Sequence, residues 1–136
     1  MSYAVSAALQ SAIFAAISSD VDVVAAVGDA VYDAIPSGVL PSLYISLGSE
    51  VVREQGDKTG AGTAHQFVVS VVTDVPGFRV AKEVAGTVCD VLEDADLTLT
   101  RGRLVSLQFR RARAFKIDKG AGRQIDLTFR ARVEDN

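Results

Sequence analysis

The chain has 136 residues, of which 49% are hydrophobic and 23% are charged. A chain of this length builds one core, and this balance excludes an intrinsically disordered protein. No apolar run approaches the roughly 20 residues of a membrane-spanning helix, and no basic residue precedes the first apolar stretch as in a secretory signal peptide. One cysteine and one histidine offer neither an internal disulfide nor a metal site. We therefore expect a single domain, residues 1–136, made in a reducing cytoplasm.

The net charge of −3 hides two oppositely charged parts of the chain. Residues 1–100 carry four basic and 13 acidic side chains, a net charge of −9. Residues 101–136 carry ten basic and four acidic side chains, a net charge of +6. Such asymmetry indicates either a surface that meets a charged partner or a solvated hairpin, and on charge alone both interpretations remain open.

Two helices are predicted at the start of the chain. Residues 4–18 place apolar side chains at helical spacing, which makes one apolar stripe. Asp20 can cap a second, short helix that runs through Val27. Gly28 follows at the place where the end of a helix favours a left-handed residue, and the prolines after it exclude a further regular helix.

Two strands are predicted next, on either side of a glycine-rich segment. Residues 66–73 are apolar on nearly both faces, which is typical of a strand in the centre of a sheet. Residues 55–63 hold three glycines, which predicts a mobile exposed loop. Residues 43–53 alternate in polarity, and this alternation places Tyr44, Ser46 and Glu50 on one face and Leu43, Ile45, Leu47 and Val51 on the other.

A second long helix and a final hairpin complete the predicted fold. Residues 103–117 and 123–133 form the hairpin, and in its second strand every odd-numbered residue from 125 to 133 faces the core. The order of elements is ααββαββ, which predicts an α+β fold: an antiparallel β-sheet with two main helices packed on one face. The second long helix, residues 78–94, has an apolar stripe made of Ala81, Val84, Ala85, Val88 and Leu92.

Catalytic groups are scarce in this sequence. His65 is the only histidine, and the sequence names no partner for acid–base work, so we expect it to face solvent. Cys89 lies at the edge of an apolar stripe with Asp90 and Glu93 nearby, which favours an inert core thiol. We expect no enzyme activity and no cofactor. A small enzyme that uses the glycine-rich loop, through Asp57 or His65, is kept as an alternative.

The last two predicted strands carry a set of basic residues. Arg111 and Arg113 interrupt the apolar face of their strand, which indicates that this strand runs past the core. In the simple alternation of the two strands, Arg110, Lys116, Arg130 and Arg132 face away from Phe109, Phe115, Phe129 and Val133.

This arginine set has three interpretations. Guanidinium groups pair with carboxylates at subunit interfaces, they remain solvated on a hairpin, or they bind the backbone of a nucleic acid. The acidic first 100 residues supply carboxylates such as Asp29, Asp33 and Asp90. We therefore expect Arg110, Arg111, Arg113, Arg130 and Arg132 to contact these acids in another copy of the chain. A nucleic-acid-binding module that uses the basic hairpin is the alternative.

Several short motifs then occur in an order that resembles a known family. Nearly end to end, the chain resembles the small tail-completion or tail-terminator proteins of long-tailed phages and gene transfer agents. It departs from the family at Ser42 and Val72, where aromatic residues are common. The motifs are, in chain order, Leu9-Gln10-Ser11-Ala12-Ile13, Val27-Gly28-Asp29, Val31-Tyr32-Asp33-Ala34-Ile35-Pro36, Pro41 with a strand ending at Gly48, Asp57-Lys58-Thr59, the helix after Gly77, and the hairpin from Leu97 with Leu127-Thr128-Phe129-Arg130.

The resemblance implies a structural role at the tail–neck junction of a virion or phage-like particle assembled in the bacterial cytoplasm. Proteins of this family form a ring, usually of six copies, on the head-proximal end of the tail tube. The ring ends polymerisation of the tube and offers a docking face to the neck and head. The implied partners are other copies of the chain, the tail tube protein and a neck or stopper protein. Double-stranded DNA passes through the ring without sequence-specific binding, and no membrane or cofactor is implied.

The glycine-rich loop is a second candidate contact. Ordering such a segment costs roughly 1–2 kcal/mol per residue, so we expect residues 55–63 to be mobile in the isolated protein and ordered by docking. Asp57, Lys58 and Thr59 are the candidate docking residues, and Lys58 is the only cation of the loop. A loop that stays mobile in both states is the alternative.

Overall fold

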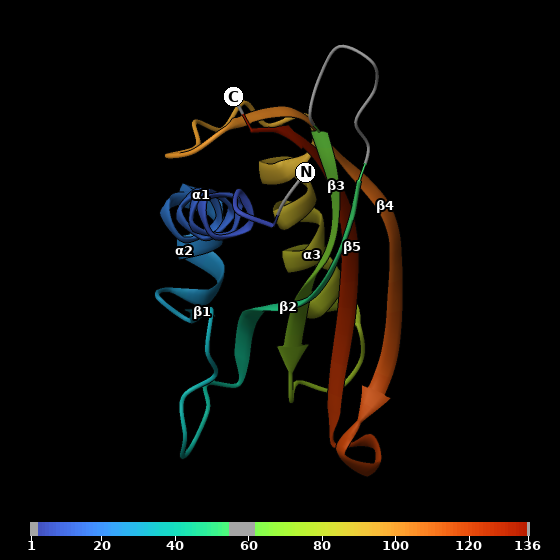
Figure 1. The fold of residues 1–136 in the computed structure, drawn as a ribbon. Coiled ribbons are helices and arrows are strands. Elements are labelled where there is room, and N and C mark those ends of the chain that lie inside the picture. Colours follow the sequence, from blue (N-terminus) through green and yellow to red (C-terminus); the bar gives the residue numbers. More distant parts are fainter. Residues whose placement is uncertain (1–2, 55–61, 136) are drawn as a thin grey trace.

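Helices cover one face of a five-stranded sheet, as Figure 1 shows. The computed structural model describes residues 3–54 and 62–135. The α+β class and the predicted order of the long elements are confirmed. The elements are α1 (Ser6–Ser19), α2 (Val21–Val27), β1 (Val31–Tyr32), β2 (Leu43–Glu54), β3 (Gly62–Thr73), α3 (Arg79–Leu92), β4 (Arg103–Ile117), a 3-10 turn η1 (Asp118–Gly120) and β5 (Gly122–Glu134).

The boundary between α1 and α2 follows from capping chemistry. The Asp20 carboxylate accepts hydrogen bonds from the backbone N–H groups of Asp22, at 3.0 Å, and Val23, at 3.1 Å, so it satisfies the first turn of α2. At the other end of α2, Gly28 has a φ of 62°, a conformation that costs other residues free energy. Both predictions for this segment are confirmed.

The sheet has the strand order β1-β2-β3-β5-β4. β3 lies in the centre, as its two apolar faces predict, because it pairs in antiparallel register with both β2 and β5. The prediction of a wholly antiparallel sheet is wrong in one detail. The two-residue strand β1 pairs in parallel with residues 45 and 46 of β2. A ladder this short leaves no periodicity in the sequence that could predict it.

The core lies between the helices and the covered face of the sheet. In β5 all five predicted inward residues are buried, from Ile125 to Val133, and Phe129 is fully buried. In α3 the whole predicted apolar stripe is buried, from Ala81 to Leu92. These elements keep an undisturbed period of two or of 3.6 residues, so their buried faces follow directly from the sequence.

In β2 the predicted alternation fails after Leu47. Gly48 and Ser49 stand opposite one residue of β3, because Leu47 pairs with Val69 while Glu50 pairs with Phe67. This bulge reverses the faces of all later residues in the strand. Glu50 therefore turns toward the helices, and Val51, predicted to be buried, is 54% exposed on the opposite face.

Candidate assembly surface

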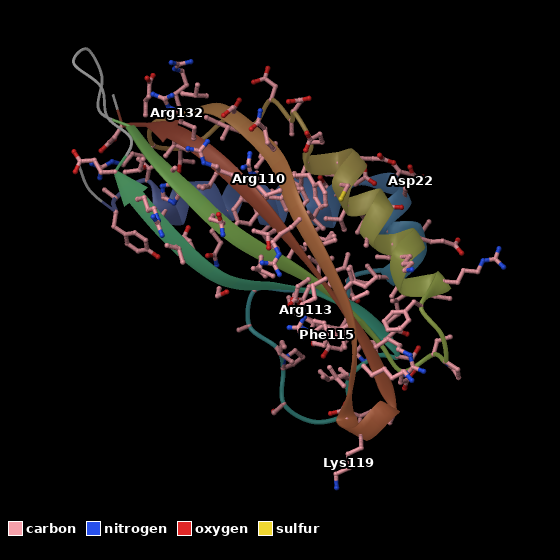
Figure 2. All side chains as sticks on the ribbon, turned by 90° about the vertical axis from the view of Figure 1, so that its right-hand side faces the viewer. Asp22, Arg110, Arg113, Phe115, Lys119 and Arg132 are labelled. Carbon is pink, nitrogen blue, oxygen red and sulfur yellow. The ribbon has the colours of Figure 1, made fainter. Side chains whose placement is uncertain are left out.

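The face of the sheet opposite the described helices, called here the helix-free face, carries arginines of β4 and β5 (Figure 2). Arg130 and Arg132 of β5 alternate with buried residues such as Phe129, so their side chains project on this helix-free face. Arg53 of β2 lies on the same face, where it lines a shallow depression of about 170 Å³ with Gln66 and Arg130. Sequence reasoning missed Arg53, because the bulge in β2 decides its face.

A bulge in β4 adds three more arginines to this face. The register between β4 and β5 shifts between Phe109 and Arg111, so Arg110 is an extra residue. Beyond the shift the alternation reverses. Arg111 and Arg113 consequently project from the helix-free face, and the prediction that they interrupt the core face is wrong. Figure 2 shows Arg110 and Arg113 on this side, toward the viewer.

The same shift overturns two further predictions. Phe115, expected on the core side, lies on the helix-free face, where the guanidinium carbon of Arg113 is 4.4 Å from the centre of its ring. Lys116, expected on the helix-free face, pairs with Arg123 on the helix side of the sheet. On that side the guanidinium carbon of Arg123 is 5.5 Å from the ring centre of Phe78 at the start of α3.

The outer edge of β4 is covered over only part of its length. β4 is the last strand of the sheet. Near its middle the backbone N–H of Asp94 donates to the carbonyl of Leu107 at 2.9 Å, and the N–H of Phe109 donates to the Glu93 carboxylate. Residues 110–114 are exposed on both faces. The prediction that this strand runs past the core is therefore confirmed.

The predicted acidic partners lie away from this surface. Asp29 and Asp33 flank β1, at the opposite edge of the sheet from β4, and the side-chain amide of Gln10 donates a hydrogen bond to Asp33. Asp90 is exposed on α3, on the helix side. In the described ranges, the ion pairs between arginines and acids are Arg79–Glu83, Arg101–Asp135 and Arg103–Glu134. The fold thus gathers the arginines, and it separates them from these acids within one chain.

His65 is buried, which contradicts the expectation of a solvent-facing side chain. It lies on the helix side of central strand β3, and both of its ring nitrogens have partners. Nδ1 lies 3.1 Å from a carboxylate oxygen of Glu50, and Nε2 lies 2.9 Å from the hydroxyl of Thr63. Sequence reasoning missed this network because the β2 bulge places Glu50 inside. The signal that points to the bulge is Gly48 within a strand.

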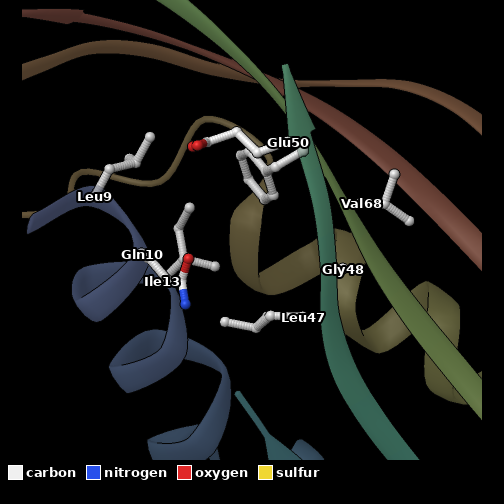
Figure 3. A pocket seen from close by; sticks show the side chains of 8 residues that line it. Leu9, Gln10, Ile13, Leu47, Gly48, Glu50 and Val68 are labelled. Carbon is white, nitrogen blue, oxygen red and sulfur yellow. The ribbon is translucent and has the colours of Figure 1, made fainter. Parts of the chain in front are cut away.

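Glu50 also connects the sheet to the start of the chain. Its carboxylate accepts hydrogen bonds from the hydroxyls of Tyr3, at 2.6 Å, and Ser6, at 2.8 Å. Figure 3 shows its side chain directed from β2 toward α1, beside a cavity of about 20 Å³ between them. Burial alone would raise the pKa of Glu50. The hydrogen bonds from Tyr3, His65 and Ser6 outweigh burial and lower the pKa below its ordinary value of 4.5.

We predict that Glu50→Gln reduces the loss of stability in acid. A carboxyl group whose pKa is lower in the folded state binds fewer protons there than in the unfolded chain, so its contribution is complete above pH 4.5 and is lost as the pH falls below that value. Urea unfolding of both proteins from pH 3 to pH 7 measures the effect. The variant is expected to be less stable at pH 7 and to show a shallower decline below pH 4.5. Parallel curves would contradict the prediction.

The remaining candidates from the sequence are Cys89, a metal site and the loop residues 57–59. Cys89 is partly buried, and burial, then Asp90 and Glu93, raises the pKa of its thiol, which keeps the nucleophilic thiolate scarce. In residues 3–54 and 62–135, no group of three or more His, Cys, Asp or Glu side chains could hold a metal ion. Asp57, Lys58 and Thr59 lie outside the described residues.

The helices of the described ranges are short relative to a bilayer. No single helix there is long and apolar enough to cross one. Taken together, α1 and α2 have the length and apolar composition of a membrane span, but a bend of 73° separates the two helices.

The geometry defines a small α+β protein with an arginine-bearing sheet face and a partly open strand edge, both suited to contacts with other chains. The sequence matches the family described as tail completion protein gp17 over residues 11–134. A chain in a solved structure described as "Virion of native gene transfer agent (GTA) particle" is 54% identical, with a TM-score of 0.93, and the match covers 98% of this chain and 99% of that chain. A comparison with curated protein sequences returns no match.

The chain therefore belongs to the tail completion protein family, as the resemblance of its motifs predicts. It is a structural tail protein, a component of a virion-like particle.

Proposed function

We propose that the protein forms a ring of six copies that caps the head-proximal end of the tail tube. The ring ends polymerisation of the tube and provides the face on which the neck and head dock. Its partners are further copies of the chain, the tail tube protein and a neck or stopper protein. Double-stranded DNA passes through the lumen without sequence-specific binding. The role is structural and requires no enzyme activity. The observation that carries this proposal is the 54% identity to a gene transfer agent virion chain over 98% of the sequence.

Opposed charges support self-association of the proposed ring. The helix-free face gathers Arg110, Arg111, Arg113, Arg130 and Arg132, and the candidate acids Asp29, Asp33 and Asp90 lie on other sides of the molecule. Two sets that cannot meet within one chain can meet between neighbouring copies. Each exposed pair contributes only about 0.2–1 kcal/mol, so the set acts together rather than through one residue.

The glycine-rich loop is proposed as a further contact with an adjacent ring or subunit. Of the predicted loop, residues 62 and 63 belong to β3, which corrects its C-terminal boundary, and residues 55–61 lie outside the described residues. Asp57, Lys58 and Thr59 remain the candidate docking residues. Amide hydrogen exchange in the free protein and in assembled particles tests this proposal. Equal exchange rates for this segment in both samples would contradict it.

Removing the gene from a producing cell is expected to leave heads and tails unjoined, with some tails longer than normal. Without a cap, tube subunits continue to add at the open end, and the neck has no face on which to dock. Electron microscopy of lysates measures tail length and the joined fraction. Restoring the unaltered gene in trans is the control. Joined, transfer-competent particles of normal tail length without the gene would contradict the proposed function.

A nucleic-acid-binding role is the second candidate, and one observation favours it. Phe115 lies beside Arg113 on the arginine-bearing face, and single-stranded nucleic acids stack on aromatic rings next to basic groups. Retention of the isolated protein on single-stranded DNA, measured against salt concentration, decides this point. Retention that falls steeply with salt and is lost in Phe115→Ala would favour the alternative. Absence of retention at low salt would exclude it.

A further inference from the structure

The outer edge of β4 lacks a neighbouring strand beyond Phe109 in the described part of the chain. Leu107 and Phe109 direct their backbone groups outward, toward Asp94 and Glu93. The extra residue at the bulge then moves the outward positions from odd to even numbers, because backbone groups alternate along an antiparallel strand. The N–H and C=O groups of Ala112, Ala114 and Lys116 therefore point outward from the sheet.

The same stretch has room for an added strand. Residues 110–114 are exposed on both faces, so no helix of the described chain covers either side of this edge. The side chains on the helix side are the small Ala112 and Ala114, which pair with Leu127 and Ile125 of β5. An incoming strand would meet little steric hindrance there. An edge of this kind is a template for pairing with another chain.

The arginines beside the β4 edge determine which kind of strand can pair with it. In the described ranges, no carboxylate lies within ion-pair distance of Arg110, Arg111 or Arg113. An extended strand with Asp or Glu on the helix-free face would place carboxylates beside these guanidinium groups. On the covered half of this edge, the Glu93 carboxylate already accepts a hydrogen bond from the backbone N–H of Phe109.

A second copy of the chain does not supply such a strand. Pairing β4 with β4 of another copy would set arginines against arginines. The open edge of β2 carries Arg53 on the helix-free face, so it would add positive charge to the same surface. The acidic segment at residues 93 and 94 already contacts the β4 of its own chain. None of these three segments supplies an acidic strand, which favours a different protein as the source.

We propose that the β4 edge from Arg110 to Lys116 binds, by strand addition, an extended acidic segment of another protein of the particle. Carboxylates on alternate residues of that segment pair with Arg111 and Arg113. Main-chain hydrogen bonds to Ala112 and Ala114 fix the register of the added strand relative to β4. For Arg111 and Arg113 this partner replaces the contact between copies proposed above. The proposal requires only that the chain is assembled into a particle, so its failure is distinguishable from a failure of ring formation or tube termination.

Amide hydrogen exchange tests the added strand in the unaltered protein. In the isolated chain, the outward amides of Ala112 and Ala114 should exchange fast, whereas those of Arg111 and Arg113, directed toward β5, should exchange slowly. In purified particles, peptides covering residues 110–117 should lose their fast-exchanging amides, with exchange slower by about tenfold or more. Fast exchange of these amides in particles would overturn the proposal. Protection in the purified protein alone, on self-association, would overturn the assignment to a different protein.

Proline substitution tests the same edge without changing its charge. Ala112→Pro removes one outward N–H and keeps every arginine, and proline is tolerated where an edge N–H faces solvent. We expect joined particles to fall by about tenfold or more when this variant replaces the native gene, while its circular dichroism and self-association remain unchanged. Ala112→Gly, which keeps the N–H, is the matched control and should assemble normally. If Ala112→Pro misfolds, Ala114→Pro takes its place. Normal assembly of a folded proline variant would overturn the proposal.

Discussion

Replacing Arg110, Arg111 and Arg113 together with glutamate is expected to abolish incorporation into particles while the isolated chain stays folded. All three side chains are exposed on β4, and Arg110 is the extra residue of a bulge, so none of them supports the core. The replacement changes the local charge by six units and turns attraction to a carboxylate partner into repulsion. Single replacements should have mild effects, because one exposed pair is worth only about 0.2–1 kcal/mol.

The matched control replaces the same three arginines with lysine. Lysine keeps the positive charge but loses the planar, bidentate guanidinium group, so it separates charge from geometry. Particle incorporation is measured by complementation, and folding by thermal unfolding of the purified variant. Normal incorporation of the folded glutamate variant would contradict a role for this surface. Ala112→Pro leaves all three charges in place. A defect in the triple glutamate variant alone would therefore indicate side-chain contacts, and a defect in Ala112→Pro alone would indicate strand addition.

The sequence predicts the central and final elements well because their hydrophobic periods are undisturbed. The alternation from Ile125 to Val133 and the helical stripe from Ala81 to Leu92 each correspond to one buried face. The central place of β3 follows from its apolar residues on both faces. In these elements, burial of apolar surface is the main force that drives folding, and it acts on a regular pattern.

The failures come from bulges, which change the period by one residue. In β2 the bulge brings Glu50 inside and leaves Val51 exposed, and in β4 it moves Phe115 to the helix-free face. Gly48 is a sequence signal for the first bulge, because glycine within a strand often marks one. In the structure, a Cβ added at Gly48 would lie 3.3 Å from the carbonyl oxygen of Val68. The bulge at Arg110 has no comparable signal, since every residue around it is compatible with a regular strand.

The sequence therefore predicts which residues form the candidate surface but not how they are arranged. Charge arithmetic alone indicates that the last two strands carry the basic residues, and the structure places Arg110, Arg111, Arg113, Arg130 and Arg132 of that set on one sheet face, with Arg123 on the other. Which neighbours they have depends on register. The contact between buried His65 and partly buried Glu50 could not be predicted for the same reason, because two side chains on different strands meet only once the pairing is fixed.

Phe129→Ala is expected to cause the largest loss of stability of any single replacement proposed for this protein. The Phe129 side chain is fully buried in β5. Its ring centre lies 5.7 Å from that of Phe67, in a stacked arrangement, and 5.9 Å from that of Phe109, edge to face. Removing the ring loses both aromatic contacts and leaves a cavity between the sheet and the helices. Such replacements cost about 3–5 kcal/mol, a large share of the roughly 5–15 kcal/mol that stabilises a typical domain.

Phe109→Ala is the matched control, because the two rings face each other across the β4–β5 pair and Phe109 is 40% exposed. Its removal exposes little new apolar surface and opens no closed cavity, so it should cost about 1 kcal/mol. Urea unfolding of the two variants and the unaltered protein gives the comparison at 25 °C. We expect Phe129→Ala to lower the unfolding free energy at least twice as much as Phe109→Ala. Equal losses would show that the core does not extend to Phe129 in the way that its burial indicates.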